Sequence, residues 1–195
     1  MRSKRLTEGC VALVLGAGRG RRFGSDKRLA RLPSGQTLLA ATLARVLEVF
    51  ERVVVVIRAD DDPQVLGVDS RVRVVRAAQA DDGMGASLAA GISALDEDAQ
   101  AVAVLLGDMP WIESGTLQAL AGEARAGRIV LPVYQGQRGH PVIFGRDFWP
   151  ALARVRGDQG GRQVVGGNPD ACLWIEVEDA GVLRDVDVPR DLGDA

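Results

Sequence analysis

Apolar residues along this chain gather in short continuous runs rather than at alternating positions. The runs, rich in valine, leucine, isoleucine and alanine, lie at residues 10–15, 52–57, 72–75, 101–106, 129–133 and 173–177. Continuous apolarity over so short a length predicts strands that are buried on both faces, as in a parallel sheet covered by helices.

The segments between these runs show helical spacing. Apolar residues between 38 and 50 fall on one stripe, and Thr37 or Ser34 can cap the start of a helix there. Alanine-rich segments near 86–95 and 115–126 follow the same pattern. Strands that alternate with helices predict an α/β, Rossmann-like three-layer fold with a mostly parallel central sheet. With 195 residues, 47% of them hydrophobic, the chain has the size of a single domain, residues 1–195.

Charge and cysteine content serve mainly to exclude classes of partner and site. Lys and Arg number 24 against 26 Asp and Glu, so the net charge of −2 argues against a nucleic-acid or membrane-surface partner. Cys10 and Cys172 lie in apolar stretches without a neighbouring Cys or His, and we expect two buried free thiols in a reducing compartment. The basic N-terminus and the apolar run after it imitate a signal peptide, but that run is short and leads into an arginine cluster. We therefore expect a cytoplasmic protein.

The residues that follow the predicted strands carry the candidate chemistry, because ligands of parallel α/β sheets bind at the carboxyl ends of the strands. The first such loop, 16-GAGRGRRFGSDK-27, has glycines at 16, 18 and 20 that permit tight turns and close approach of a ligand to the backbone. Its basic side chains are those of Arg19, Arg21, Arg22 and Lys27, followed by Arg28. Converging N–H groups and cations favour an anion, so the loop predicts a polyphosphate site.

Two common phosphate loops fail to fit. No glycine here is followed by lysine, as a P-loop requires. The dinucleotide pattern G-x-G-x-x-G matches Gly16 and Gly18, but Arg21 occupies the third glycine position, and Asp60 lies farther on than the usual ribose-binding acid. An NAD(P)-dependent oxidoreductase that uses the Gly16–Gly20 loop stays open as an alternative. A non-catalytic nucleotide-binding protein that delivers cofactor to another enzyme is a second one.

The same loop resembles the L-A-A-G-x-G-x-R-M-G-x-x-K signature of nucleotidyltransferases, with Gly16 in place of alanine and Phe23 in place of methionine. The resemblance continues through 83-GMGASL-88, 107-GDMP-110, 138-RGHPVIFG-145, 157-GDQGGR-162 and 185-DVDVPRDL-192. Together these motifs cover nearly the whole chain and resemble the molybdenum cofactor cytidylyltransferase branch of the MobA-like NTP transferases.

This resemblance implies an activity. A nucleoside monophosphate passes from an NTP, with CTP as the expected donor, to a phosphorylated pterin-type acceptor, molybdopterin, with Mg²⁺ as cofactor and pyrophosphate as leaving group. It also implies onward transfer to a molybdoenzyme or its chaperone. Base choice and the acceptor stay open. The oligomeric state also stays open, because four aromatic residues suit either a core or an interface: Trp111, Phe148, Trp149 and Trp174.

The resemblance assigns roles residue by residue. Nucleotide-binding residues are Leu15, Gly16, Ala17, Gly18, Arg19, Gly20, Arg22, Lys27, Gly83 and Ser87. Catalytic residues are Lys27 and Arg22, which offset charge on the leaving pyrophosphate, and Asp108, a Mg²⁺ ligand. In a bare sequence Asp108 also suits an Asx turn, and Ser87 suits a helix start.

The remaining roles lie in the second half of the chain. Asp187 either completes the metal site or caps the closing helix, and Val188 replaces the threonine usual in this motif. Arg138, His140 and Arg162 are the expected acceptor contacts. His140 is not needed as a general base, because an acceptor phosphate is already ionised near neutral pH.

Overall fold

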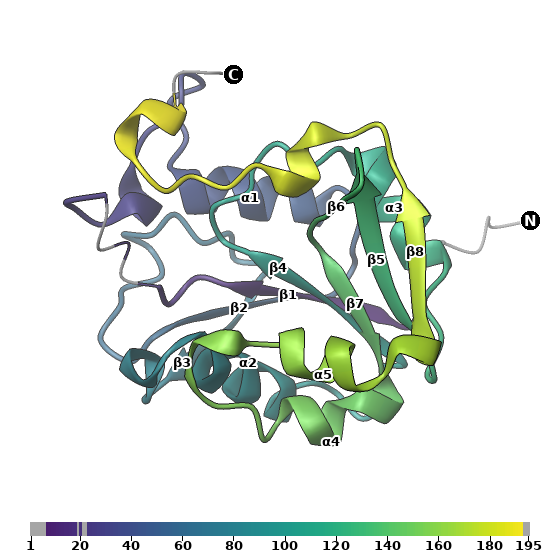
Figure 1. Ribbon diagram of the computed structural model, residues 1–195. Coiled ribbons are helices and arrows are strands. Elements are labelled where there is room, and N and C mark those ends of the chain that lie inside the picture. Colours follow the sequence, from purple (N-terminus) through teal and green to yellow (C-terminus); the bar gives the residue numbers. More distant parts are fainter. Residues whose placement is uncertain (1–6, 19, 21–22, 193–195) are drawn as a thin grey trace, which may run out of the picture.

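The computed structural model describes residues 7–18, 20 and 23–192 as a three-layer α/β domain with one central sheet (Figure 1). The strands are β1 Cys10–Leu15, β2 Val53–Arg58, β3 Arg73–Ala77, β4 Ala101–Leu106, β5 Ile129–Tyr134, β6 Gln137–Arg138, β7 Val142–Gly145 and β8 Cys172–Glu176. The helices are α1 Leu38–Leu47, α2 Met84–Ser93, α3 Ser114–Gly122, α4 Trp149–Leu152 and α5 Arg162–Gly167. Short 3-10 turns connect several of them.

The sheet confirms the expected mostly parallel architecture. Its order is β3-β2-β1-β4-β7-β5, with β6 and β8 also paired to β5. Strands β1 to β5 and β8 run in one direction, and β7 is antiparallel to both β4 and β5. The sequence pattern missed β6 and β7, since glycines and Pro141 interrupt the apolar residues there.

Two hydrophobic cores fill the spaces above and below the sheet. One core packs α1 and α3 on a face that includes Ala12 and Val14, and the other packs α2, α4 and α5 on the face of Val11 and Leu13 (Figure 1). This alternation along β1 explains why its six residues read as continuously apolar: each face of the sheet is covered. Thr37 caps α1 by accepting the Ala40 N–H, as one of the two sequence alternatives predicts.

The two thiols differ in burial. Both cysteines are free, but only Cys10 is fully buried, and burial raises the pKa of its thiol to about 12. Cys172 is half-buried in strand β8. Among residues 7–18, 20 and 23–192, no helix has the length and apolarity needed to cross a membrane.

Gly85 in α2 has no room for a side chain, and we expect Gly85→Ala to destabilise the domain by about 1–3 kcal/mol. A Cβ at this position would lie 2.8 Å from the carbonyl oxygen of Gly157 and 2.9 Å from the carbonyl carbon of Arg156, so the backbone of that segment would have to move. Gly115 in α3 is the matched control, because its Cβ would meet nothing within 4 Å and alanine favours helices. Urea denaturation of both variants should show a loss at Gly85 only; equal stabilities would contradict the contact.

Candidate active site

A cavity of about 850 Å³ opens at the carboxyl ends of β1 and β4, beside the start of α2. Its lining comes from residues 15–18, 20, 27–28, 38, 80–84, 87, 106–108, 158, 162, 185 and 187. The loop after each of these two strands therefore faces the same space, which is the place where ligands of parallel α/β sheets bind.

The structure brings most of the expected nucleotide-binding residues together in this lining. Those that lie in it are Leu15, Gly16, Ala17, Gly18, Gly20, Lys27, Gly83 and Ser87. The roles expected for Arg19 and Arg22 fall outside the described residues, as does Arg21.

Lys27 lies in a short 3-10 turn, and its ammonium group joins the two ends of the chain. Nζ donates to Asp108 Oδ2 at 2.5 Å and to the Val186 carbonyl oxygen at 2.8 Å, and lies 3.8 Å from Asp187 Oδ1. The stem of Lys27 packs on Gly20, where a Cβ would come within 2.9 Å of the lysine Cγ and φ is +54°. Glycine at position 20 thus lets the lysine reach the carboxylates.

The carboxylates around Lys27 have the character of a cation site. Asp108 Oδ1 is buried and has no hydrogen-bond partner among the residues that the structure describes. Burial raises the pKa of the neighbouring Asp185, and the charges of Asp108 and Asp187 add to this effect. Like charges held this close are costly unless a cation accompanies them.

These residues fit a hard divalent cation. Within the described residues no three His, Cys, Asp or Glu side chains are arranged around one metal position, and the candidate ligands are the two carboxylates beside Lys27, those of Asp108 and Asp187. Mg²⁺ typically takes one or two carboxylates together with water and substrate phosphates. A cap of the closing helix stays the alternative role for Asp187, whose own N–H, like that of Val188, is accepted by the carboxylate of Asp191.

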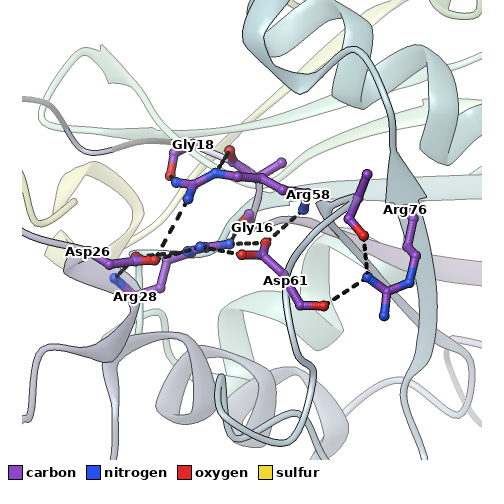
Figure 2. A network of polar contacts seen from close by, with 9 residues as sticks. Gly16, Gly18, Asp26, Arg28, Arg58, Asp61 and Arg76 are labelled. Carbon is purple, nitrogen blue, oxygen red and sulfur yellow. Dashed lines mark hydrogen bonds and ion pairs between the residues drawn. The ribbon is translucent and has the colours of Figure 1, made fainter.

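The sequence analysis missed the role of Arg28, which it counted only as part of the basic run. The side chain of Arg28 is 5% exposed and is bound by the carboxylates of Asp26 and Asp61 (Figure 2). The sequence held a partial signal, since Asp26 lies two residues away, but Asp61 belongs to the loop after β2. Its neighbour Asp60, the ribose-binding acid of the oxidoreductase alternative, is exposed and does not line the cavity.

The three expected acceptor contacts separate in the structure. Arg162 lines the cavity. Arg138 is exposed in β6 and lies over the ring of Trp174, with its guanidinium carbon 4.3 Å from the ring centroid. His140 donates its backbone N–H to Val182, and neither it nor Arg138 belongs to the described lining of the cavity.

His140, the single histidine of the chain, should make stability depend on pH. Burial lowers the pKa of its imidazole, the charge of Arg162 lowers it further, and Asp185 and a backbone hydrogen bond at Val104 oppose them. Because the fold favours the neutral ring, the unfolded chain binds the proton more readily below its ordinary pKa of 6.5. The contribution of His140 to the unfolding free energy should be complete above that pH and should be lost as the pH falls. The loss amounts to about 1.4 kcal/mol per unit of difference between the pKa of His140 in the unfolded and in the folded chain.

Urea denaturation at pH 7.5 and pH 5.0 measures this effect. The decline on acidification should be larger in the wild type than in His140→Gln, which has no group that titrates in this range. Equal declines in the two proteins would mean that His140 is not its source.

The chain and its fold match a known family of proteins. The model of the MobA-like NTP transferase domain matches residues 12–172. A nucleotidyl transferase from Methanothermobacter thermautotroptrophicus superposes with a TM-score of 0.77 at 25% identity, covering 93% of each chain. Rv0371c from Mycobacterium tuberculosis, solved in complex with manganese, superposes with a TM-score of 0.75 at 26% identity, covering 93% of this chain and 94% of its own.

The match to a curated relative covers only part of that relative's length. The bifunctional protein GlmU from Trichlorobacter lovleyi is 32% identical over 152 residues, which are 75% of this chain and 32% of that protein. The chain thus spans about a third of the length of the curated relatives it matches. Because the family model covers most of the chain and includes the glycine loop, Lys27 and Asp108, the chain belongs to the family of the MobA-like NTP transferase domain.

Proposed function

We propose that the protein is a Mg²⁺-dependent nucleotidyltransferase that moves a nucleoside monophosphate from an NTP to a phosphorylated acceptor and releases pyrophosphate. The observation that carries this proposal is the meeting of the glycine loop, Lys27 and Asp108 in one cavity. Family membership and a solved relative named as a nucleotidyl transferase support it.

The reaction forms one bond and breaks another. An oxygen of the acceptor phosphate attacks the α-phosphorus of the NTP, and the bond between the α-phosphorus and the bridging oxygen of the pyrophosphate breaks. Such transfers depend on positioning and charge neutralisation more than on covalent chemistry. A bound Mg²⁺ supplies charge neutralisation at the phosphates.

The chain supplies the remaining parts. The N–H groups of Ala17 and Gly18 bind the triphosphate, and Lys27 stabilises the charge that develops on the leaving pyrophosphate. Asp108 and Asp187 would hold the Mg²⁺, the former with Oδ1, which has no hydrogen-bond partner among the described residues. Gly83 and Ser87, at the start of α2, line the same cavity and are the proposed contacts of the nucleoside. Arg162 is the described cation of the cavity available to the acceptor phosphate.

We further propose CTP as the donor and molybdopterin as the acceptor, in the cytoplasm, with onward transfer of the product to a molybdoenzyme or its chaperone. The support is the set of motifs from 83-GMGASL-88 to 185-DVDVPRDL-192, which resemble the molybdenum cofactor cytidylyltransferases. Arg138 and His140 stay proposed acceptor contacts, which would require the acceptor to extend beyond the cavity lining.

Incubation of the protein with molybdopterin, Mg²⁺ and each of CTP, GTP, ATP and UTP tests this proposal. Pyrophosphate release is measured by a coupled assay and the pterin product by mass spectrometry. We expect one pyrophosphate per cytidylylated pterin, with CTP as the best donor. A product with another base would correct the donor, whereas no product with any of the four would contradict the acceptor.

A further inference from the structure

Two arginines bind the loop that follows β1 by its carbonyl oxygens. Nη1 of Arg28 donates to the carbonyl oxygen of Gly16 at 2.9 Å. Arg58, at the end of β2, donates from Nε to Ala17 at 3.1 Å and from Nη2 to Gly18 at 2.7 Å (Figure 2). Three successive carbonyl groups of the glycine loop are therefore held by guanidinium donors.

The positive charges of these two arginines are balanced by carboxylates within the same network. Asp61 accepts from Nη2 of Arg28 at 2.8 Å and from the backbone N–H of Arg58 at 2.7 Å, and Asp26 accepts from Nε of Arg28 at 2.8 Å. Burial acts to raise the pKa of Asp61, but the hydrogen bonds from Arg28 and from the Arg58 backbone outweigh it and hold that pKa below its ordinary value. Two cations and two carboxylates leave little net charge for a ligand, so the effect of the network is on geometry.

That geometry fixes where the N–H groups of the loop point. In a trans peptide the C=O and N–H bonds point in opposite directions. Arg28 holds the carbonyl of Gly16 and Arg58 holds that of Ala17, so the N–H of Ala17 points away from Arg28 and the N–H of Gly18 points away from Arg58. The Gly16 N–H is already bound to Val56 at 2.8 Å, whereas the next two N–H groups have no backbone acceptor among the described residues. Residues 16–18 and Arg28 line the cavity, and Arg58 does not.

We propose that Arg28 and Arg58 are positioning residues, which hold the carbonyl side of the glycine loop so that the Ala17 and Gly18 N–H groups face the triphosphate. This inference rests on the proposed function for the identity of the ligand. The network consists only of contacts within the chain, so in this proposal it orders the loop without help from a ligand and lowers the ordering cost of binding.

Arg58 is the better residue to change, because removal of Arg28 would leave two carboxylates with too few donors and endanger folding. The side chain of Arg58 is 17% exposed. Arg52 offers a matched control: it precedes the same strand at the opposite end, and pairs with Asp98 at 2.8 Å on the surface. Arg58→Ala, Arg58→Lys and Arg52→Ala form the set.

Two measurements are made on each protein. Backbone ¹⁵N relaxation of the free protein gives order parameters at Ala17 and Gly18; we expect about 0.85 in the wild type and below about 0.6 in Arg58→Ala. Calorimetry gives the Kd for CTP with Mg²⁺, and for tripolyphosphate with Mg²⁺ to remove any dependence on the base. We expect both Kd values to rise about tenfold in Arg58→Ala and less in Arg58→Lys, with Arg52→Ala unchanged in both measurements.

The outcomes separate this inference from the proposed function. Unchanged order parameters in Arg58→Ala, or unchanged Kd values despite a mobile loop, would overturn the positioning role while the function stood. A wild type that bound neither CTP nor tripolyphosphate would overturn the proposed function, and with it the assignment of a triphosphate to these N–H groups. The order parameters would then still show whether Arg58 rigidifies the loop.

Discussion

Lys27→Met should lower turnover by about 10²–10³-fold, because it removes a charge-assisted donor aimed at the leaving pyrophosphate. Methionine keeps an unbranched stem that can pack on Gly20, so the loop itself should persist. Without the ammonium, Asp108 and Asp187 repel each other, and the melting temperature should fall in the absence of metal. Mg²⁺ should restore part of that stability by binding the same carboxylates, without restoring turnover.

Steady-state rates and melting curves with and without Mg²⁺ test this expectation. Arg31→Met is the control, since Arg31 lies four residues away, is exposed, and bonds only to the Gly35 carbonyl among the described contacts. Wild-type turnover in Lys27→Met would remove the lysine from the mechanism. It would also favour the alternative of a nucleotide-binding protein that does not need this residue for catalysis.

Asp108→Asn should remove the Mg²⁺ dependence of the protein and lower turnover by at least about 10²-fold. Asp108 is the second residue after β4, and asparagine in its place can still accept the Lys27 hydrogen bond, so the local structure should be kept. Its neutral amide is a poorer ligand for a hard cation, and the phosphates lose the charge neutralisation that the cation supplies. The apo protein should melt no lower than the wild type, because one of three crowded negative charges is gone.

The Mg²⁺ titration of turnover and of the nucleotide-induced rise in melting temperature measures this change. Asp98→Asn controls for loss of an aspartate, since Asp98 pairs with Arg52 on the surface. A titration curve in Asp108→Asn that overlays the wild-type curve would place the metal elsewhere.

The fold and the glycine loop could be predicted from local sequence patterns. The runs at 10–15 and 101–106 match β1 and β4 residue for residue, because strands covered on both faces leave an apolar signal that needs no knowledge of their partners. The end of α1 was less visible: it stops at Leu47, whereas the apolar stripe continues to Phe50. Phe50 is buried after the helix has ended, so its burial reflects packing rather than helical periodicity.

Contacts between segments far apart in the sequence could not be predicted from the pattern of residues. Arg28 meets Asp61 across 33 positions, and Lys27 meets the carbonyl of Val186 across 159. A basic residue in a basic run looks the same whether it faces a ligand or a buried carboxylate, since the difference depends on which loop packs against it. His140 shows the same limit, because its burial is decided where residues 139 and 140 pack against Val182.

The central claim is that this cavity binds a nucleoside triphosphate together with Mg²⁺. A thermal-shift panel of the wild type against CTP, GTP, ATP, UTP and NAD, each with and without Mg²⁺, tests it most directly, because a ligand that binds only the folded state raises the melting temperature. We predict a Mg²⁺-dependent rise that is largest with CTP. A rise with NAD alone would contradict the claim. So would the absence of any rise with all four triphosphates at every Mg²⁺ concentration.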